Sequence, residues 1–510
     1  MLAKTMAVVA ALVLAAVPTP ATAAPGLAWA SRPQPQAAKY HAECATLVSG
    51  GVTLTLLRIP STGPSQGPVL ADSQEIDGYG GSQIDFFLRH GDNYLARLPR
   101  THRTHDIVLA DPRGLGGSTP VRCPTSAHDP ALPELPATPR DTAQIAAHGW
   151  AVYVRCAAAT GPLIARTGLA EQADDLETVR TALGAPRLDF LGQATGAELA
   201  VVYAARHPAH AGRIVLDTAI DPFLPAARRV LDVARAEETA FTRFAAWCAG
   251  APDRCPLAGQ DVPAVLDEVV TRGVPGLTGD EVRIAVGQFL LGYPVAWPGI
   301  AHALAAAREG DGSELAPYAA LTYTEPDYTA SHAQTCADHP STPGRLAGLA
   351  QRVHALAPHT GGISLHWDAL VSCTGWPDGP SLTERLPGRL APATPVLVTA
   401  TEDDPINPSA WTADIGARIA GSHVLIAPVA GHGALDNAPC AADAIDSYLA
   451  TGALPSDEEC RSGAGNPSPP PSGDALSVDF ATILAMNSPH TGMSERKNAW
   501  RSRPQRAATG

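Results

Sequence analysis

Short apolar runs alternate with longer segments of helical periodicity between about residues 50 and 220 of this chain. The short runs predict strands over 52–60, 105–110, 187–191 and 213–216. Helical spacing of apolar residues predicts helices over 170–183 and 195–207. Strands that alternate with helices at this spacing indicate βαβ units and a mainly parallel sheet flanked by helices. The alternating, β-branched run over 52–60 is typical of a strand at the edge of such a sheet.

The pattern changes at about residue 223 and changes back at about residue 389. Between those positions the chain has helical segments, for example over 226–248, 262–272 and 279–291, and no clear strand run. Strands resume at 395–399 and 423–426. A helical insertion between strands of one sheet predicts a cap over the carboxyl edge of those strands. We therefore place the two halves of an α/β core at 44–222 and 390–460, and a large helical cap at 223–389.

The two ends of the chain differ in composition from this core. Lys4 precedes an apolar stretch over 6–17, and small residues at 21–23 offer a cleavage site, which together predict a secretory signal peptide over 1–23 and export from the cell. An uncleaved amphipathic or core helix is the alternative interpretation. We expect an N-terminal tail over 24–43, and a Pro/Ser-rich linker with a disordered tail over 461–510.

Charge and hydropathy exclude two kinds of partner. The chain has 50 acidic and 36 basic residues and no run of lysine or arginine, so a nucleic-acid backbone is not an expected ligand. No segment beyond the first residues is long and apolar enough to span a bilayer, so we expect no membrane association after signal cleavage. The acidic balance serves solubility and identifies no substrate.

Nine cysteines fit an oxidising compartment, where disulfides persist. Proximity along the chain suggests four pairs, although sequence alone does not fix their connectivity. The suggested pairs are Cys123 with Cys156, Cys248 with Cys255, Cys336 with Cys373, and Cys440 with Cys460. Cys44 is left over, either as a thiol or as a bridge to another chain. A zinc site would require spacing such as CxxC, which the chain lacks, so we predict no metal.

A glycine-flanked turn stands between the strand at 187–191 and the helix that follows it. Its sequence is Gly192-Gln193-Ala194-Thr195-Gly196. In a nucleophile elbow the apex is normally a serine, and the glycines allow the close approach of backbones at the bend. Here the apex is Ala194, while the backbone N–H of Thr195 is the expected oxyanion donor. Glu198, one helical turn later, is interpreted as a solvated or paired carboxylate in preference to a catalytic one.

Two further residues follow late strands. Asp404 comes just after the strand at 395–399, and His432 lies in a glycine loop after the strand at 423–426. A turn-starting aspartate and a structural histidine are the alternative interpretations. The chain order of elbow, acid and histidine is nevertheless the order of α/β-hydrolases. An aspartate so placed can orient an imidazole and stabilise its protonated form.

These segments resemble the secreted tripeptidyl-aminopeptidase-like α/β-hydrolases of bacteria, a family in the prolyl-aminopeptidase superfamily. The similarity runs from about Cys44 to Cys460 and rests on the segments IVLADPRGLGGSTPVRC, LDFLGQATGAELAVVYAARHPAHAGRIVLDTAIDP, WCAGAPDRCP, TCADHP, SCTGWP, TEDDPINP and AGHGALDNAPCAADAIDSYLATGALPSDEEC. By this resemblance Asp404 is the triad acid and His432 is the triad base; we also predict no organic cofactor. The resemblance also supports the four cysteine pairs and implies a peptide or small-molecule ligand in a pocket shaped by the cap.

The chain departs from the family pattern at three places. The family elbow reads Gly-x-Ser-Tyr-Gly, whereas this chain has Ala194 and Thr195. The family's Gly-Gly-Pro-Gly-Gly-Ser-Gly loop near the oxyanion hole is replaced by a stretch that contains Gly78. The family's N-terminal VPLDY segment is missing after Cys44. Drift at several places favours natural loss of the serine over a laboratory substitution.

Three classes of function remain open. The first is a conventional peptidase or esterase, which would require another nucleophile because alanine cannot attack a carbonyl; Thr195 is a poor substitute because it starts the helix. The second is an enzyme for proton transfer, elimination or cyclisation in which His432, oriented by Asp404, acts as a general base. The third is a non-catalytic protein that binds a peptide or small molecule. Retention of both Asp404 and His432 favours the second over the third. The sequence leaves the oligomeric state and the role of Cys44 open.

Overall fold

The computed structural model of the chain describes residues 27–31, 35–73, 81–291, 296–319, 328–341, 343–377, 379–456 and 460. The predicted signal peptide over 1–23, the loop residue Gly78 and the predicted tail over 461–510 lie outside the described residues. No helix of the described part is long and apolar enough to cross a membrane.

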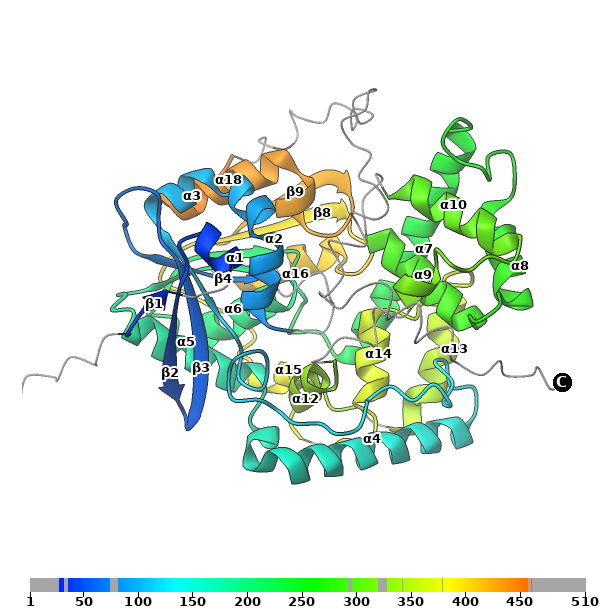
Figure 1. Cartoon of the computed structure of the whole chain (residues 1–510), viewed down its shortest axis with the longest axis horizontal. Coiled ribbons are helices and arrows are strands. Elements are labelled where there is room, and N and C mark those ends of the chain that lie inside the picture. The colour runs from blue at the N-terminus through cyan, green and yellow to red at the C-terminus, as the bar shows by residue number, and fades with distance from the viewer. Residues whose placement is uncertain are drawn as a thin grey trace, which may run out of the picture.

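A mixed sheet forms the centre of the α/β core (Figure 1). Within the described residues its nine strands have the order β1-β2-β3-β5-β4-β6-β7-β8-β9. The strands are β1 (Ala30–Ser31), β2 (Glu43–Ser49), β3 (Val52–Ile59), β4 (Pro68–Ser73), β5 (Asp106–Ala110), β6 (Leu188–Gln193), β7 (Ala211–Asp217), β8 (Val396–Asp403) and β9 (His423–Ala430). Pairing is antiparallel from β1 through β2 and β3 to β5, and parallel from β5 to β9. The parallel strands therefore point their carboxyl ends to one edge, which is where the elbow and the acid loop follow.

The prediction that 52–60 forms an edge strand was wrong. β3 pairs with β2 on one side and with β5 on the other. A tight turn at Gly50 and Gly51, with φ values of 54° and 85°, folds β2 back onto β3. β1 then pairs outside β2, so residues expected in an N-terminal tail join the sheet and α1 (Pro35–Lys39).

Helices cover both faces of the sheet because side chains along each strand alternate between two apolar clusters. Ile107 and Leu109 of β5 pack with α2 (Gln83–Arg97) and α18 (Pro439–Thr451), against which α3 (Pro99–Thr104) lies, whereas Val108 faces the opposite cluster. That second cluster includes α5 (Leu169–Ala182), α6 (Thr195–Arg206) and α16 (Ser409–Arg418). The result is a sheet between two layers of helices, which is the predicted α/β-hydrolase architecture.

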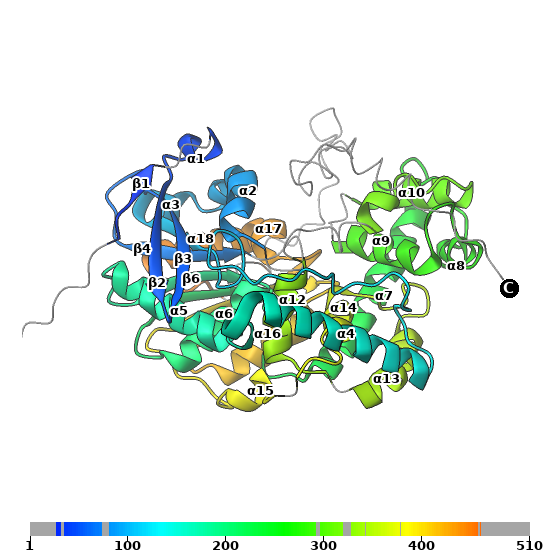
Figure 2. The same cartoon turned by 60° about the horizontal axis from the view of Figure 1, so that its bottom comes forward.

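Helices between β7 and β8 lie beside the sheet (Figures 1 and 2). They are α7 (Ala226–Gly250), α8 (Val262–Arg272), α9 (Gly279–Leu291), α10 (Trp297–Arg308), α12 (Tyr328–Asp338), α13 (Leu346–Leu356), α14 (Leu365–Ser372) and α15 (Leu382–Arg385). α8, α9 and α10 stand to one side of the sheet, whereas α12 and α15 pack against the core. α7 to α10 share an apolar core of their own. A long helix from the first half, α4 (Pro139–Thr160), packs against α13 and α14, so the helical layer also takes a segment from between β5 and β6.

Four disulfides join the cysteines that proximity and resemblance had paired. They link Cys123 to Cys156, Cys248 to Cys255, Cys336 to Cys373, and Cys440 to Cys460. The third ties α12 to α14, and the fourth ties the start of α18 to the end of the described chain. Cys44 lies half-buried on β2, against the apolar cluster on one face of the sheet.

Candidate active site

The elbow is a sharp turn between β6 and α6, as the sequence predicted. Ala194 has φ of 46° and ψ of −111°, which is a strained backbone for a residue with a side chain. A Cβ on Gly192 would lie 2.4 Å from the carbonyl oxygen of Gly196, and one on Gly196 would lie 2.3 Å from that of Asp72. Only glycine therefore fits at these two positions, and the apex geometry is kept although the apex is alanine.

Asp404 begins the loop after β8, and its buried carboxylate accepts four hydrogen bonds. Oδ1 accepts from the backbone N–H groups of Ile406 and Asn407, both at 2.9 Å. Oδ2 accepts from the hydroxyl of Thr218 at 2.8 Å, and Nδ1 of His432 lies at the same distance. Thr218 itself has a positive φ of 53°, and its carbonyl accepts from the Asn407 side chain at 2.9 Å. The carboxylate is thus fixed in position and directed at the imidazole.

Asp217, at the end of β7, holds the loop that carries His432. The Asp217 carboxylate accepts hydrogen bonds from the backbone N–H groups of Ala434 and Leu435, at 3.2 and 3.1 Å, and from the hydroxyl of Thr399 at 2.6 Å. These amides begin α17 (Ala434–Asn437), so the carboxylate lies where the helix has unpaired N–H groups. Burial raises the pKa of Asp217 to about 6.

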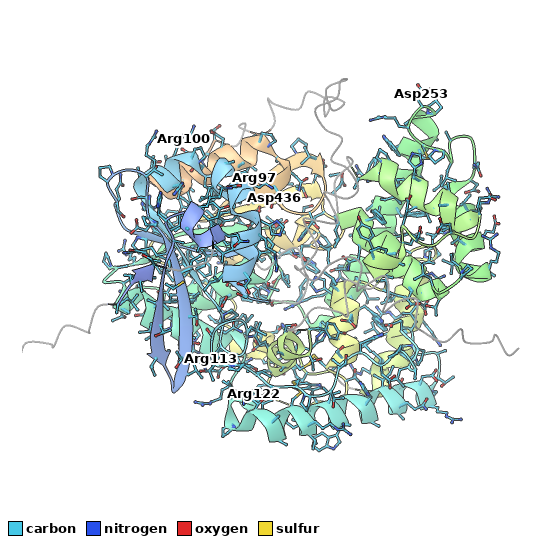
Figure 3. All side chains as sticks on the ribbon, viewed as in Figure 1. Arg97, Arg100, Arg113, Arg122, Asp253 and Asp436 are labelled. Atoms are coloured by element: carbon cyan, nitrogen blue, oxygen red, sulfur yellow. A yellow bond between two sulfur atoms is a disulfide. The ribbon has the colours of Figure 1, made fainter. Side chains whose placement is uncertain are left out.

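A surface ion pair ties the same loop to α2. Arg97 Nη2 lies 3.2 Å from Asp436 Oδ1, and Figure 3 shows the two side chains next to each other. The loop after β5, which lies in the quoted segment IVLADPRGLGGSTPVRC, is also tied to a helix, because Arg113 makes two hydrogen bonds to Asp175 on α5, at 2.6 and 2.7 Å. Both pairs connect loops near the carboxyl edge of the sheet to helices of the core.

A cavity of about 120 Å³ lies between the elbow and the cap helices. Ala194, Thr195 and His432 line it from the core, so the structure brings the apex, its neighbour and the histidine to one site. Its other lining residues are Leu169, Gln172, Glu198, Ile220, Arg229, Gln334, Thr335, Asp338, His339, Leu365, His366, Ala369, Ile406 and Asn407. Asp404 lies behind His432 and is buried.

Charged and titratable side chains also line the cavity, and they pair with one another. Glu198, predicted as a solvated or paired carboxylate, accepts a hydrogen bond from Arg229 Nη2 at 2.9 Å. Burial acts to raise the pKa of Glu198, but the charge of Arg229 and the hydrogen bond to His339 outweigh it and lower that pKa to about 2. Burial and the charge of Arg229 lower the pKa of His366 to about 4, so this imidazole is neutral at pH 7.

The sequence named four core residues that the structure brings together at this site, and it missed other core residues and those of the cap. Ala194, Thr195, Asp404 and His432 were each marked by a strand end, whereas Gly78 lies outside the described residues. Arg229 and His366 come from cap helices, His339 directly follows α12, and none of the three has a local signal of that kind. Asn407 stands in the quoted TEDDPINP segment, and that resemblance was the one available indication of it.

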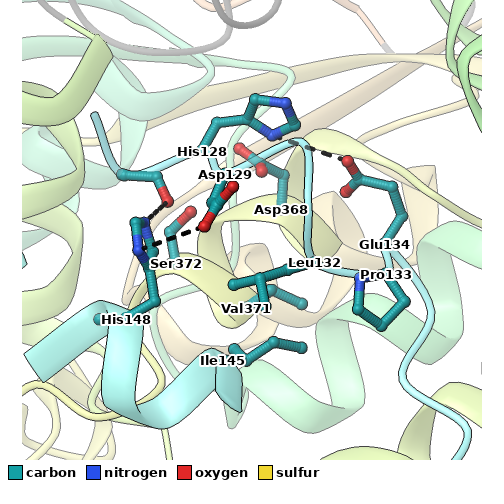
Figure 4. Close-up of a pocket in the computed structure, with 12 residues that line it drawn as sticks. His128, Asp129, Leu132, Pro133, Glu134, Ile145, His148, Asp368, Val371 and Ser372 are labelled. Carbon is teal, nitrogen blue, oxygen red and sulfur yellow. Dashed lines mark hydrogen bonds and ion pairs between the residues drawn. The ribbon is translucent and has the colours of Figure 1, made fainter. Parts of the chain in front are cut away.

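A second cavity, of about 30 Å³, lies between the loop over 127–134, α4 and α14 (Figure 4). His128 Nδ1 lies 3.6 Å from Glu134 Oε1, and His148 Nδ1 lies 3.9 Å from Asp129 Oδ2. The space suits about one water molecule and no organic ligand. In the described part of the chain no group of three or more His, Cys, Asp or Glu side chains is arranged to hold a metal ion.

Comparison with known proteins gives matches across most of the chain. A family model described as TAP-like protein matches residues 363–460, and one described as alpha/beta hydrolase fold matches residues 78–256. Serine protease Hip1 of Mycobacterium tuberculosis is 26% identical over 437 residues, which cover 79% of this chain and 82% of that protein. Carboxylesterase B of the same organism is 29% identical, covering 79% and 81%. Tripeptidyl aminopeptidase of Streptomyces lividans is 27% identical, covering 79% and 78%.

Proposed function

We propose, from the premise that the chain belongs to the TAP-like α/β-hydrolase family, that it is a secreted member of that family. In it, acyl-enzyme hydrolysis is lost at Ala194, and His432 acts as a general base. The ligand, a peptide or small molecule, binds in the cavity between the elbow and the cap. No nucleic acid or membrane takes part. Secretion is tested by expressing the full chain: we expect the protein in the medium with an N-terminus at Ala24, and a chain that stays in the cells with Met1 retained would refute it.

The loss of hydrolysis follows from the chemistry of the apex. The methyl group of Ala194 cannot attack a carbonyl or carry an acyl group. Without the nucleophile, an oxyanion hole and substrate binding together give a residual acceleration of only about 10³ to 10⁴ over water. Thr195 is no replacement because it is the first residue of α6.

The contact between Asp404 and His432 is the observation that carries the proposed base. Nδ1 of His432 lies 2.8 Å from a carboxylate oxygen that is itself fixed by Thr218. Such a carboxylate holds the proton on Nδ1 and stabilises the imidazolium that forms when the ring accepts a second proton. The same ring lines the cavity beside Ala194, so a ligand held there meets an oriented base.

Proton abstraction from isoxazole, which is small enough for this cavity, tests this role, because the ring opens when a base removes its C3 proton and no covalent nucleophile is required. We expect the unmodified protein to accelerate ring opening and His432→Ala to abolish the acceleration. Asp404→Asn should reduce it by orders of magnitude, because it stabilises the wrong tautomer and removes the charge that favours the imidazolium. Equal rates for the unmodified protein and His432→Ala would refute a general base and favour a non-catalytic binding protein.

A further inference from the structure

The Glu198–Arg229 pair spans the boundary between the core and the cap. Glu198 comes from α6, one turn after the apex, and Arg229 comes from the first turn of α7. Each side chain is 5% exposed, and both line the cavity beside Ala194. A buried ion pair is costly to desolvate and does not by itself indicate stability. Because both residues of the pair line a cavity, their polar atoms are placed to bind a ligand there.

The pair has unused hydrogen-bonding capacity. Among the described residues, Arg229 donates from Nε to the Leu224 carbonyl at 3.2 Å and from Nη2 to Glu198, and its Nη1 lies 3.3 Å from His339 Nε2. A guanidinium has five N–H donors, so two remain if His339 Nε2 accepts from Nη1, and three remain if Nε2 instead carries a proton and donates to Glu198. Glu198 Oε1 takes the contacts to Arg229 and, at 3.4 Å, to His339, while Oε2 accepts nothing from the described part of the chain. The wall thus offers an acceptor and donors that the protein itself does not use.

The wall also has no charge left over. The negative charge of Glu198 is matched by Arg229, and Asp338 accepts from the backbone of Leu169 at 2.6 Å and pairs with Arg385. His366 lies 3.1 Å from the Asn407 side-chain oxygen and is neutral at pH 7. A ligand group with a net charge would be buried here without a counter-ion, which is strongly unfavourable. The ligand group should therefore be neutral overall and should both donate and accept.

We propose that this cavity binds a primary carboxamide, such as the side chain of a glutamine or asparagine, between Glu198 and Arg229. A primary carboxamide presents its carbonyl and one N–H along the same edge, so the N–H can donate to Glu198 Oε2 while the carbonyl accepts from Arg229. A trans peptide bond presents these two groups on opposite sides and cannot satisfy both. A zwitterion would add two more buried charges and would compete with the existing pair.

Size is consistent with this assignment. A cavity of about 150 Å³ holds a benzene molecule, and this one has about 120 Å³. A carboxamide with two methylene groups has about five non-hydrogen atoms, which fits that space. The proposal rests on the proposed function only in placing the ligand in this cavity, and it requires no turnover.

Matched probes test the assignment on the complete, unmodified protein. N-acetyl-glutamine N-methylamide, its glutamate and methionine counterparts and free alanine are titrated by calorimetry or ligand-detected NMR. We expect the glutamine probe to bind about tenfold or more tightly than the other three, because the glutamate repels Glu198, the methionine leaves polar groups unpaired and alanine is a zwitterion. Equal affinities, or preference for any other probe, would overturn the proposal.

A charge-changing variant gives a second and independent readout. In Glu198→Gln the charge of Arg229 is no longer compensated, so the preference should reverse from the glutamine probe to the glutamate probe. Glu237→Gln is the matched control, because Glu237 is also a buried glutamate and does not line the cavity. The control should keep the preference for glutamine. An unchanged preference in a folded Glu198→Gln protein would contradict the assignment, and if that variant does not fold, the probe series on the unmodified protein decides alone.

The two proposals fail in different ways. If His432 is not a base, His432→Ala has no effect on ring opening, but the glutamine preference remains in both proteins. If the carboxamide assignment is wrong, the preference is absent while ring opening still depends on His432. Binding of the probes is therefore measured in His432→Ala as well, where we expect the preference to be unchanged.

Discussion

At the scale of single residues, the site keeps its geometry without its nucleophile. Ala194 holds φ of 46° because its N–H donates to the Asp217 carbonyl at 3.1 Å and its carbonyl accepts from Glu198 N–H at 3.1 Å. A positive φ costs a residue with a Cβ roughly 1–2 kcal/mol. The flanking glycines and these two bonds hold the turn, so the elbow does not depend on a serine at the apex.

Thr218 is the residue on which the orientation of Asp404 can be tested. Thr218→Val removes the hydroxyl that donates to Asp404 Oδ2 at 2.8 Å and keeps the side-chain shape. A hydrogen bond to a charged group is worth about 1.5–3 kcal/mol, so we expect His432-dependent ring opening to fall about tenfold or more. Thr218→Ser keeps the hydroxyl and serves as the control. A valine variant as fast as the serine variant would show that this bond does not position the carboxylate.

At the scale of elements, hydrophobic periodicity predicted the bounds of regular helices. It missed a strand and a side-chain position that depend on contacts between elements far apart in the sequence. The predicted helix over 262–272 has those same bounds in the structure. β4 was not predicted because its run PVLADS contains three consecutive apolar residues between a proline and an aspartate, and its place between β5 and β6 is set by the sheet. Arg229 was missed for a similar reason, since nothing in the sequence of α7 shows that one of its arginines faces the elbow.

Glu237 on α7 is buried against α9, and its burial makes the free energy of unfolding depend on pH. Burial, with a smaller contribution from Glu238, raises the pKa of Glu237 to about 8. Its Oε2 has no hydrogen-bond partner among the described residues, and Oε1 lies where a Cβ on Gly287 of α9 would be 2.5 Å away. The pKa of Glu237 is higher in the folded protein than in the unfolded chain. Its contribution to the free energy of unfolding is therefore fully present below about pH 4.5 and is lost as the pH rises through about 8.

Glu237→Gln should therefore stabilise the protein more at pH 8 than at pH 5. The gain at pH 8 should be on the order of a few kcal/mol, because the wild-type carboxyl must bind a proton or be buried as an ion. Thermal unfolding of both proteins across this range is the measurement. A parallel pH dependence of the two unfolding temperatures would show that Glu237 is not protonated in the folded state.

At the scale of the whole molecule, disulfides join elements that surround the cavity. Cys336–Cys373 ties α12 to α14 across a separation of 37 residues, and these helices carry or adjoin His339 and His366. Cys248–Cys255 closes a separation of 7 residues at the end of α7. Loop-closure entropy predicts that the longer bridge contributes more, about 4 kcal/mol against about 2 kcal/mol.

Replacing each pair by serines should show this difference in denaturant unfolding. The Cys336/Cys373 variant should lose more free energy of unfolding than the Cys248/Cys255 variant and should also bind the glutamine probe less tightly. The second variant is the control, because its bridge lies away from the cavity. Equal losses of stability, with unchanged probe affinity in both, would show that the longer bridge does not hold the cavity wall.

Labelling of the purified protein with a fluorophosphonate, which reacts with an activated serine, tests whether hydrolysis is lost at Ala194. The unmodified protein should remain unlabelled and should not release chromophore from tripeptidyl anilides. Ala194→Ser should be labelled, and the double variant Ala194→Ser/His432→Ala should not, because the serine needs the imidazole as its base. Labelling or His432-dependent hydrolysis by the unmodified protein, or an inert Ala194→Ser protein, would contradict the claim that hydrolysis is closed by the loss of this one side chain.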